Sequence, residues 1–283
     1  MTLALGIDVG ASKILAAIVD VSTGIVKARS AIKTDLNLTG GVILDQCVEL
    51  AKNLVAETSI TSAGISLCEI VDSNGVIRSN QSIDWRALDI ASAFKSFHSV
   101  KVESDVRAAA LAEATYGAGI TSESFLYVNI GSGISSAFVI RGKVWSGENG
   151  AAILLGAGPI HAESKGSGLA IARQFGVSNS RVVAKAALEG DVNASNLFIS
   201  AAKFAGDAIA FAVNLLDPQL VVLGGGLVLN VPIYRQALED QMRVSIWSED
   251  ARNVKLLNTQ LSADSAVIGA AIISLDRVKL KAF

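Results

Sequence analysis

The sequence has few of the residues that stabilise small secreted proteins, and no segment typical of a membrane protein. Two cysteines among 283 residues, Cys47 and Cys68, are too few for a disulfide framework or a cysteine-rich metal site. No apolar run approaches the roughly 20 residues that a bilayer span requires. The apolar N-terminus also lacks the basic region of a signal peptide. We therefore expect a cytoplasmic protein that contacts no membrane.

Charge is also scarce, and neither sign dominates. Charged residues make up 18% of the chain and the formal net charge is −2, so no electrostatic argument favours a nucleic-acid partner. Three prolines leave little extended coil. Hydrophobic residues are abundant at 51%, with a mean hydropathy of +0.48. This composition favours an α/β protein with buried strands.

Apolar runs and glycine turns predict two halves of related design. Residues 3–32 are expected to form three strands, with a glycine-containing tip between the first two. The same order of strand, glycine tip, strand, turn and strand recurs over residues 125–146. We place the boundary between the halves near residues 117–119. Further strands are expected at 60–66, 100–103 and within 217–226, and helices at 40–58, 88–97, 105–116, 166–174, 180–189, 194–216 and 263–274.

The first hairpin tip carries residue types that bind phosphate. Gly10 offers an unhindered amide, Ser12 a hydroxyl and Lys13 a cation, while Asp8 could hold Mg²⁺ through water. The tip matches neither the Walker A loop nor the dinucleotide-binding fingerprint. Taken alone, it is explained equally well as a tight hairpin with an exposed lysine.

Two further glycine turns bear on this choice. Gly131, Ser132 and Gly133 form a second tip of similar chemistry, and two such tips could grip the phosphates of one nucleotide. Gly224 and Gly225 follow an apolar run in a turn that suits a flat adenine ring. That turn is also common simply where a strand leads into a helix.

Asp105 is the best candidate for a catalytic carboxylate. It follows a short apolar strand and opens an alanine-rich helix. Phosphoryl transfer to a hydroxyl requires a carboxylate that orients the acceptor and accepts its proton. The alternative is a helix N-cap, which would stabilise the helix by about 1 kcal/mol.

Four segments together resemble the ROK family of sugar kinases and repressors. They read GIDVGASK, VESDVRAAALAEATYGAG, FLYVNIGSGISSAFVIRGKVWSGENGAA and DPQLVVLGGGL, and they match in order over nearly the whole chain. The resemblance implies an α/β, two-lobed actin-like ATPase (ribonuclease H-like) fold with a nucleotide and sugar cleft between the lobes. The expected N-terminal lobe is 1–117, completed by the C-terminal helix 263–283, and the expected C-terminal lobe is 118–262.

The resemblance also assigns roles, position by position. It implies ATP and Mg²⁺ as cofactors, a small sugar-like substrate and a homodimer. The first phosphate loop corresponds to Asp8, Gly10, Ser12 and Lys13, with Asp8 holding Mg²⁺ through water, and the second loop corresponds to Gly131, Ser132 and Gly133. The adenosine turn corresponds to Gly224 and Gly225, and the catalytic base to Asp105. The substrate contacts correspond to Asn80, Ser104 and Glu163.

The chain departs from the family pattern near the sugar. The asparagine that usually precedes the catalytic aspartate is Ser104, and a usual Pro-Gly reads Cys68-Glu69. In the stretch GENGAAILLGAGPIH, Leu154 and Ala157 stand where the family has a Glu and a His that bind sugar hydroxyls. The zinc-binding cysteine segment is missing, so we expect no zinc, and His161 has no cysteine partners there.

These features predict an ATP-dependent kinase that acts on a hydroxyl of a sugar or sugar-like substrate other than plain glucose. The alternative is a non-catalytic sugar or nucleotide sensor derived from such a kinase. An actin-like ATPase that acts on proteins is a third hypothesis. The chain starts on the first expected strand, so we expect no helix-turn-helix of the kind that ROK repressors carry.

Overall fold

The computed structural model describes residues 2–275, which fall into two compact units. The first unit comprises residues 2–120, 142–152 and 263–275, and the second comprises residues 121–141 and 153–262. Residues 276–283 of the expected C-terminal helix 263–283 lie outside the described residues.

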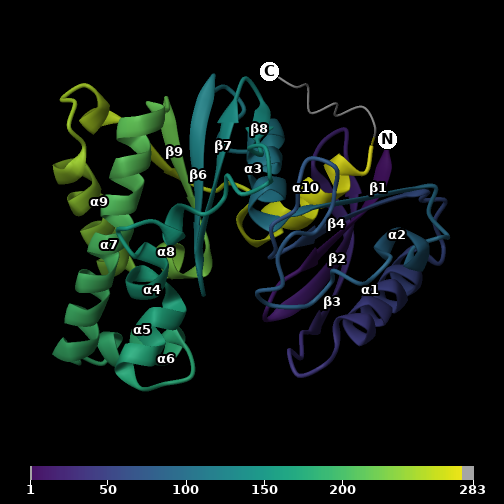
Figure 1. The fold of residues 1–283 in the computed structure, drawn as a ribbon, viewed down its shortest axis with the longest axis horizontal. Coiled ribbons are helices and arrows are strands. Elements are labelled where there is room, and N and C mark those ends of the chain that lie inside the picture. Colours follow the sequence, from purple (N-terminus) through teal and green to yellow (C-terminus); the bar gives the residue numbers. More distant parts are fainter. Residues whose placement is uncertain (1, 276–283) are drawn as a thin grey trace. The chain divides into compact units, whose positions relative to one another are not determined.

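The first sheet joins an antiparallel hairpin to a parallel edge. Its strands are β1 (Leu3–Val9), β2 (Lys13–Asp20), β3 (Ile25–Lys33), β4 (Ser62–Leu67) and β5 (Ser99–Ser104), in the order β3-β2-β1-β4-β5 (Figure 1). Strands β1, β2 and β3 pair antiparallel, whereas β1, β4 and β5 run parallel. The carboxyl ends of β1, β4 and β5 therefore meet at one edge of the sheet.

Helices cover both faces of this sheet. Leu5 and Ile7 of β1 belong to the apolar cluster that includes residues of α1 (Gly40–Val55), while Gly6 between them faces α10 (Ser265–Ile273). Because successive side chains of a strand point to opposite faces, α1 and α10 lie on opposite sides. Two shorter helices, α2 (Ile90–Ala93) and α3 (Asp105–Tyr116), flank β5 in the sequence.

The second sheet repeats the topology of the first. Its strands are β6 (Ser124–Ile130), β7 (Ile134–Ile140), β8 (Lys143–Trp145), β9 (Leu220–Gly224) and β10 (Lys255–Asn258), in the order β10-β9-β6-β7-β8. Strands β6 and β7 form an antiparallel hairpin, and β6, β9 and β10 run parallel. The predicted repeat of strand, glycine tip and strand is confirmed.

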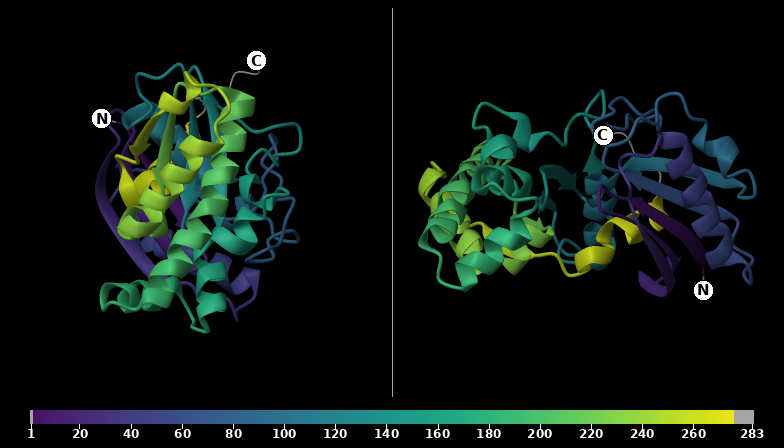
Figure 2. Two further views of the ribbon diagram at one scale, coloured as in Figure 1. Left: turned by 90° about the vertical axis from the view of Figure 1, so that its left-hand side faces the viewer. Right: turned by 90° about the horizontal axis from the view of Figure 1, so that it is seen from below.

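A long pair of helices packs beside the second sheet. Helix α7 (Val192–Leu216) lies alongside α9 (Pro232–Ser245) in Figures 1 and 2. The other helices of this unit are α4 (Ala162–Gly166), α5 (Gly168–Phe175), α6 (Ser180–Leu188) and α8 (Gly226–Asn230).

Helix α7 also bears on the membrane question. Among residues 2–275 it alone is long and apolar enough, by length and composition, to cross a membrane. Half of its most apolar window, 50%, is buried inside the structure, and its Phe198 and Ile209 belong to the core of the second unit. Those contacts are the ones expected of a core helix.

Several sequence predictions about local structure were wrong. The helix expected at 88–97 is only α2, because the backbone leaves the helical region at Phe94, where ψ is 30°. The helix expected at 166–174 is α5, which begins two residues later because the extended backbone of Ser167 ends α4 and caps α5; α4 itself was not predicted. Helix α9 and strand β10 were not predicted. Buried Tyr234, Leu238 and Met242 recur every four residues in α9, which is the signal that could have found it.

Glycines let α10 approach its neighbours at backbone distance. A β-carbon on Gly6 of β1 would overlap the Val267 carbonyl oxygen of α10, and one on Gly64 of β4 would overlap the Ala270 carbonyl oxygen. Gly269 of α10 meets the Ala108 carbonyl oxygen of α3 in the same way. The close packing of β1, β4, α3 and α10 therefore requires that these three positions have no side chain.

We expect Gly64→Ala to lower the free energy of unfolding by about 2–3 kcal/mol, because the new methyl group must push α10 off the sheet. Urea denaturation measures this loss. Gly41→Ala is the matched control: it lies in α1 with no atom closer than 4.0 Å to the new methyl group, and alanine favours helix. Equal stability of Gly64→Ala and wild type would contradict the packing argument.

Candidate functional site

The carboxyl edge of β1, β4 and β5 gathers acidic side chains from distant parts of the sequence. Asp8 lies near the end of β1, Cys68 and Glu69 directly follow β4, and Asp105 follows β5. The carboxylate of Asp105 is close enough to those of Asp8 and Glu69 for both to perturb its ionisation. The parallel pairing thus brings together Asp8 and Asp105, the two acidic residues predicted to be functional in this half of the chain.

Asp105 has the electrostatics of a proton acceptor. Burial raises its pKa to about 7, and the nearby Asp8 and Glu69 carboxylates act in the same direction against the lowering effect of Arg107. One oxygen, Oδ1, accepts a hydrogen bond from the Val106 amide at 2.6 Å. A pKa near neutrality suits a general base. The N-cap interpretation of Asp105 is wrong, because Ser104 occupies that position and Asp105 is the first helical residue.

Hydrogen bonds hold the backbone of the first glycine tip, and two of its side chains are exposed to solvent. The Gly10 amide donates to the Lys13 carbonyl oxygen at 3.0 Å, and Thr34 Oγ1 donates to the Gly10 carbonyl oxygen at 2.7 Å. The side chains of Ser12 and Lys13 are exposed and make no hydrogen bond or ion pair within residues 2–275. They are therefore available to a ligand.

Asp8 and Cys68 lie next to this tip. Asp8 Oδ1 accepts a hydrogen bond from Ser66 Oγ at 2.9 Å, and burial raises the pKa of Asp8 although Ser66 and Lys13 oppose the shift. The Cys68 thiol donates to the Val9 carbonyl oxygen at 3.3 Å. Burial, reinforced by Asp105 and Asp8, raises the pKa of this thiol well above its ordinary value, so Cys68 is a neutral packing residue at neutral pH.

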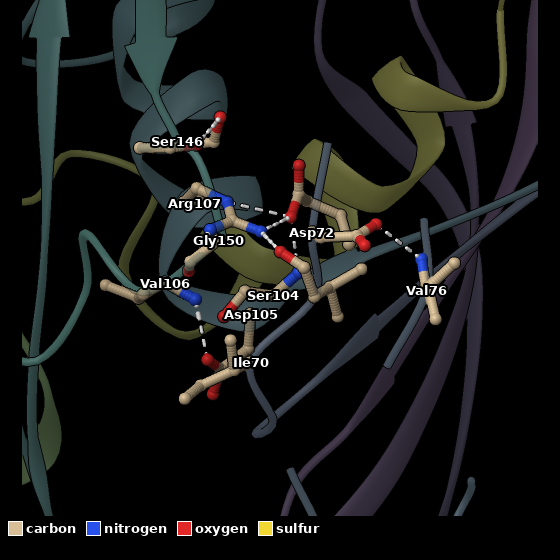
Figure 3. A network of polar contacts seen from close by, with 12 residues as sticks. Ile70, Asp72, Val76, Ser104, Asp105, Val106, Arg107, Ser146 and Gly150 are labelled. Atoms are coloured by element: carbon tan, nitrogen blue, oxygen red, sulfur yellow. Dashed lines mark hydrogen bonds and ion pairs between the residues drawn. The ribbon is translucent and has the colours of Figure 1, made fainter. Parts of the chain in front are cut away.

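Glu69 and Arg107 are two buried charges whose roles the sequence did not reveal. Each is only 2% exposed. Arg107 donates from Nη1 to the Gly150 carbonyl oxygen at 2.7 Å and from Nε to Glu103 at 2.8 Å, and its Nη2 bonds to Glu103 and to the Val71 carbonyl oxygen. Figure 3 shows these bonds beside the first turn of α3, which carries Asp105. Arg107 is therefore a buried residue that links Glu103, Val71 and Gly150, and it is neither exposed nor unpaired.

The predicted substrate contacts in this unit differ in exposure. Asn80 is exposed, and its side chain has no partner within the described chain. Ser104 is 0% exposed, and its hydroxyl is one of two buried side-chain polar atoms within residues 2–275 that lack a partner. A buried hydroxyl without a partner is costly, so this atom requires an explanation.

The second glycine tip is braced by the helices that follow it. The amides of Gly168 and Leu169 at the start of α5 donate to the carbonyl oxygens of Gly131 and Ser132 at 2.9 and 3.0 Å. The Glu163 carboxylate accepts a hydrogen bond from the Ile134 amide. Within residues 2–275 the amide of exposed Ser132 donates to no carbonyl group, which leaves it available to a ligand.

The third glycine turn has a packing explanation. A side chain on Gly225, whose φ is 96°, would overlap the backbone of Ile130, and one on Gly224 would overlap the ring of Tyr127. Both glycines are thus required for β9 to pack beside β6. This geometry accounts for them without a ligand, and an adenosine role stays a prediction.

The stretch GENGAAILLGAGPIH is divided between the two units. Residues 147–152 belong to the first unit, where Gly150, at φ 74°, packs against the Val71 carbonyl group beside Arg107. Residues 153–161 belong to the second unit and include a single 3-10 turn, Leu155–Ala157. Leu154 is 42% exposed and Ala157 is also exposed, so both positions where the family has polar sugar contacts present apolar groups to solvent.

Comparison with known proteins gives this arrangement a context. The family model described as ROK matches residues 4–277, which is nearly the whole chain. The chain belongs to the ROK family. The predicted fold class is confirmed with it, because this α/β chain with two sheets is similar to solved ROK kinases that have the two-lobed actin-like ATPase fold.

Two solved ROK structures show the likeness. A ROK hexokinase from Thermus thermophilus is 28% identical with a TM-score of 0.81, over 98% of this chain and 100% of that one. A ROK glucokinase from Streptomyces griseus, solved with glucose and AMPPNP, is 23% identical with a TM-score of 0.84, over 96% of this chain and 99% of that one. At 23% identity, the likeness to the glucokinase shows a shared fold only.

Curated ROK relatives include both enzymes and regulators. The bifunctional enzyme NanE/NanK of Brucella melitensis is 29% identical over 61% of this chain and 34% of its own length. An uncharacterised protein of Clostridium perfringens is matched over 61% of its length, so the alignment covers less than two thirds of these relatives. The DNA-binding transcriptional repressor Mlc of Escherichia coli is 24% identical over 95% of this chain and 75% of its own length.

Asp105→Asn is expected to stabilise the protein at alkaline pH. The pKa of Asp105 lies near 7 in the folded state against 3.8 ordinarily, so its ionisation disfavours folding increasingly as pH rises from 4 to 7. About three pKa units at about 1.4 kcal/mol each set an upper bound of roughly 4 kcal/mol gained at pH 8.

Urea denaturation at pH 4 and pH 8 tests this pH dependence. The gain should largely disappear at pH 4, where the wild-type carboxyl is protonated. Asp89→Asn is the control, because this exposed aspartate has a lowered pKa and should give no gain at pH 8. A pH-independent effect of Asp105→Asn would contradict the assignment.

Proposed function

We propose that this ROK protein is an ATP-dependent kinase that transfers the γ-phosphoryl group to a hydroxyl of a sugar or sugar-like acceptor. The observation that carries the proposal is the partly buried carboxyl of Asp105, with a pKa near 7, at the same strand edge as Asp8 and the open glycine tip. ROK relatives that are sugar kinases support the reaction class.

Asp105 is the proposed base. It would orient the acceptor hydroxyl and accept its proton, and the desolvated surroundings that raise its pKa also make proton transfer to it more favourable at neutral pH. Positioning and electrostatic stabilisation would supply most of the remaining rate enhancement.

The two glycine tips are the proposed phosphate contacts. Ser12 and Lys13 offer a hydroxyl and a cation without competing partners in the described chain, and Gly10 keeps that tip free of a side chain. Ser132 offers a free amide between Gly131 and Gly133. Asp8 is the proposed site for Mg²⁺ through water. Mg²⁺ would neutralise charge on the phosphates. Gly224 and Gly225 remain the proposed adenosine turn.

Asn80, Ser104 and Glu163 are the proposed acceptor contacts. The side chain of Asn80 is exposed and its amide has no partner in the described chain, which supports this role. The orphan hydroxyl of Ser104 lies one residue from Asp105, and an acceptor hydroxyl there would supply the hydrogen bond that it lacks. Glu163 has one oxygen bonded to the Ile134 amide and keeps further acceptor capacity.

We propose further that the acceptor is not plain glucose. Hydrogen bonds to charged groups contribute roughly 1.5–3 kcal/mol each, and apolar Leu154 and Ala157 cannot make the two that the family pattern places there. An acceptor with fewer hydroxyls, or with an apolar substituent on that side, fits these positions better.

Asp105→Asn should lower turnover by about 10²–10⁴-fold while leaving nucleotide affinity unchanged, because the amide keeps the shape but cannot accept the proton. ATP consumption is measured with a panel of sugars, polyols and amino sugars, and ATP affinity by calorimetry. Exposed Asp89→Asn is the control and should retain wild-type turnover.

The same panel separates the alternatives. Full activity of Asp105→Asn would contradict the assignment of Asp105 as the base. ATP consumption without any acceptor would favour an ATPase that acts on proteins. Sugar binding with no ATP consumption for any acceptor would favour the sensor, a role that the repressor relatives make relevant.

The double variant Leu154→Glu/Ala157→His should lower the KM for glucose at least tenfold, because it restores two polar groups at exposed positions that tolerate them. Steady-state kinetics with glucose measures the change. Leu188→Glu adds a charge at an exposed site on α6 and should leave this KM unchanged. An unaltered KM in the double variant would show that these positions do not set acceptor choice.

A further inference from the structure

Glu69 is a buried carboxylate that has no role in the reaction proposed above. It directly follows β4, is 2% exposed, and replaces the second residue of the Pro-Gly pair in the family pattern. A buried carboxylate is stable only when its oxygens accept hydrogen bonds, so its partners reveal what it holds.

All of its side-chain hydrogen bonds go to one short loop. Oε1 accepts from the amides of Ser82 at 2.8 Å and Ile83 at 3.2 Å. Oε2 accepts from the Gln81 amide at 2.9 Å and from the Ser79 hydroxyl. Three consecutive amides therefore converge on one carboxylate, an arrangement typical of a backbone anion site.

The three amides that Glu69 accepts from have no other acceptor in the described chain. Residues 79–83 are neither helix nor strand, and within the described chain the amides of Gln81, Ser82 and Ile83 donate to no backbone carbonyl group. Removal of the Glu69 carboxylate would leave these donors without an acceptor, and a buried donor that loses its partner is costly.

Both ends of the loop are fixed, so the carboxylate acts on its middle. On one side, the Arg78 amide donates to the Ile70 carbonyl oxygen at 2.7 Å, and Arg107 holds the Val71 carbonyl group. On the other side, Ile83 and Trp85 are buried in the core of the first unit.

Asn80 sits at the centre of this arrangement. Its two neighbours, Ser79 and Gln81, bond to the same oxygen of Glu69, while the Asn80 side chain is exposed. The carboxylate thus holds the chain on both sides of Asn80, whose side-chain amide has no partner within the described residues. We propose that Glu69 is a positioning residue that holds residues 79–83 so that Asn80 meets the acceptor, and that it thereby governs acceptor affinity.

The inference rests on the proposed kinase function for its kinetic test, but it has a second physical consequence. The charged and titratable groups that face Asp105 are Asp8 from β1, Cys68 and Glu69 after β4, and Arg107 from α3. The Glu69 carboxylate raises the pKa of Asp105, so its neutralisation should lower that pKa. Glu113, which is not among the groups that act on Asp105, would not do this.

Glu69→Gln is the principal test, because it keeps the volume but removes the charge and places a donor opposite the Gln81 amide. The acceptor is the panel compound with the highest wild-type rate. We expect its KM to rise at least tenfold with the KM for ATP unchanged, and the acidic limb of the pH profile for kcat/KM to move to lower pH.

Glu113→Gln is the matched control. Glu113 is also a fully buried glutamate of the first unit, and it accepts from the Ala118 amide at 2.8 Å and from Ser265 Oγ at 3.0 Å. Its neutralisation should reduce stability but move neither the acceptor KM nor the pH limb. Ser79→Ala removes one bond to Glu69 and the bond that Ser79 Oγ accepts from the Ile70 amide at 2.8 Å. It should raise the acceptor KM by a smaller factor than Glu69→Gln, and it serves if Glu69→Gln fails to fold.

Hydrogen exchange separates failure of this inference from failure of the proposed function. In Glu69→Gln, or in Ser79→Ala if Glu69→Gln does not fold, the amides of residues 81–83 should exchange at least tenfold faster than in wild type, with no such change in Glu113→Gln. This result does not depend on catalysis. Unchanged exchange, or faster exchange with an unchanged acceptor KM, would overturn the inference.

If wild type phosphorylates nothing in the panel, the kinase proposal fails instead. The positioning role is then decided by exchange together with calorimetric affinity for glucose and the other panel sugars. Weaker sugar binding in Glu69→Gln than in Glu113→Gln would support it, and equal binding would overturn it.

Discussion

The close approach of α10 to β1, β4 and α3 is the constraint on which the first unit depends. Gly6, Gly64 and Gly269 bring backbones into direct contact, so the ends of two parallel strands and the helix that carries Asp105 are fixed against one rigid element. A site with a desolvated carboxylate needs such rigidity, because small displacements would admit water and lower its pKa. The fold thereby maintains the electrostatics of Asp105.

Buried ions then organise the loops that this frame leaves irregular. Arg107 joins the hairpin at Val71 to the turn at Gly150, and Glu69 holds residues 79–83. Glu69 accepts mainly from backbone amides, and Arg107 donates both to backbone carbonyl oxygens and to the Glu103 carboxylate. Such pairing is the condition under which burial of a charge is tolerated. These loops are thus ordered by hydrogen bonds to buried charged groups, whereas the sheets are ordered by apolar packing.

The second unit repeats the topology but supports its glycine tip differently. There the amides that begin α5 and the Glu163 carboxylate hold the loop, whereas Thr34 and the Cys68 thiol contact the backbone of the first tip. The acceptor side has diverged as well, since Leu154 and Ala157 are apolar and exposed. The residue types expected at the two glycine tips are present, whereas two of those expected for sugar contacts are replaced by apolar residues.

The sequence by itself determined the alternation of strands and helices, the two hairpin tips and the repeat, because these follow from local periodicity and glycine placement. It also singled out Asp8 and Asp105 by residue type and position. Only the tertiary structure decided that the pKa of Asp105 lies near 7, since that value depends on burial and on the charges of Asp8, Glu69 and Arg107, which come from distant parts of the chain. The partners of Glu69, Arg107 and Ser104 were equally beyond the sequence, because hydrogen-bond satisfaction is a property of groups that folding brings together from distant positions.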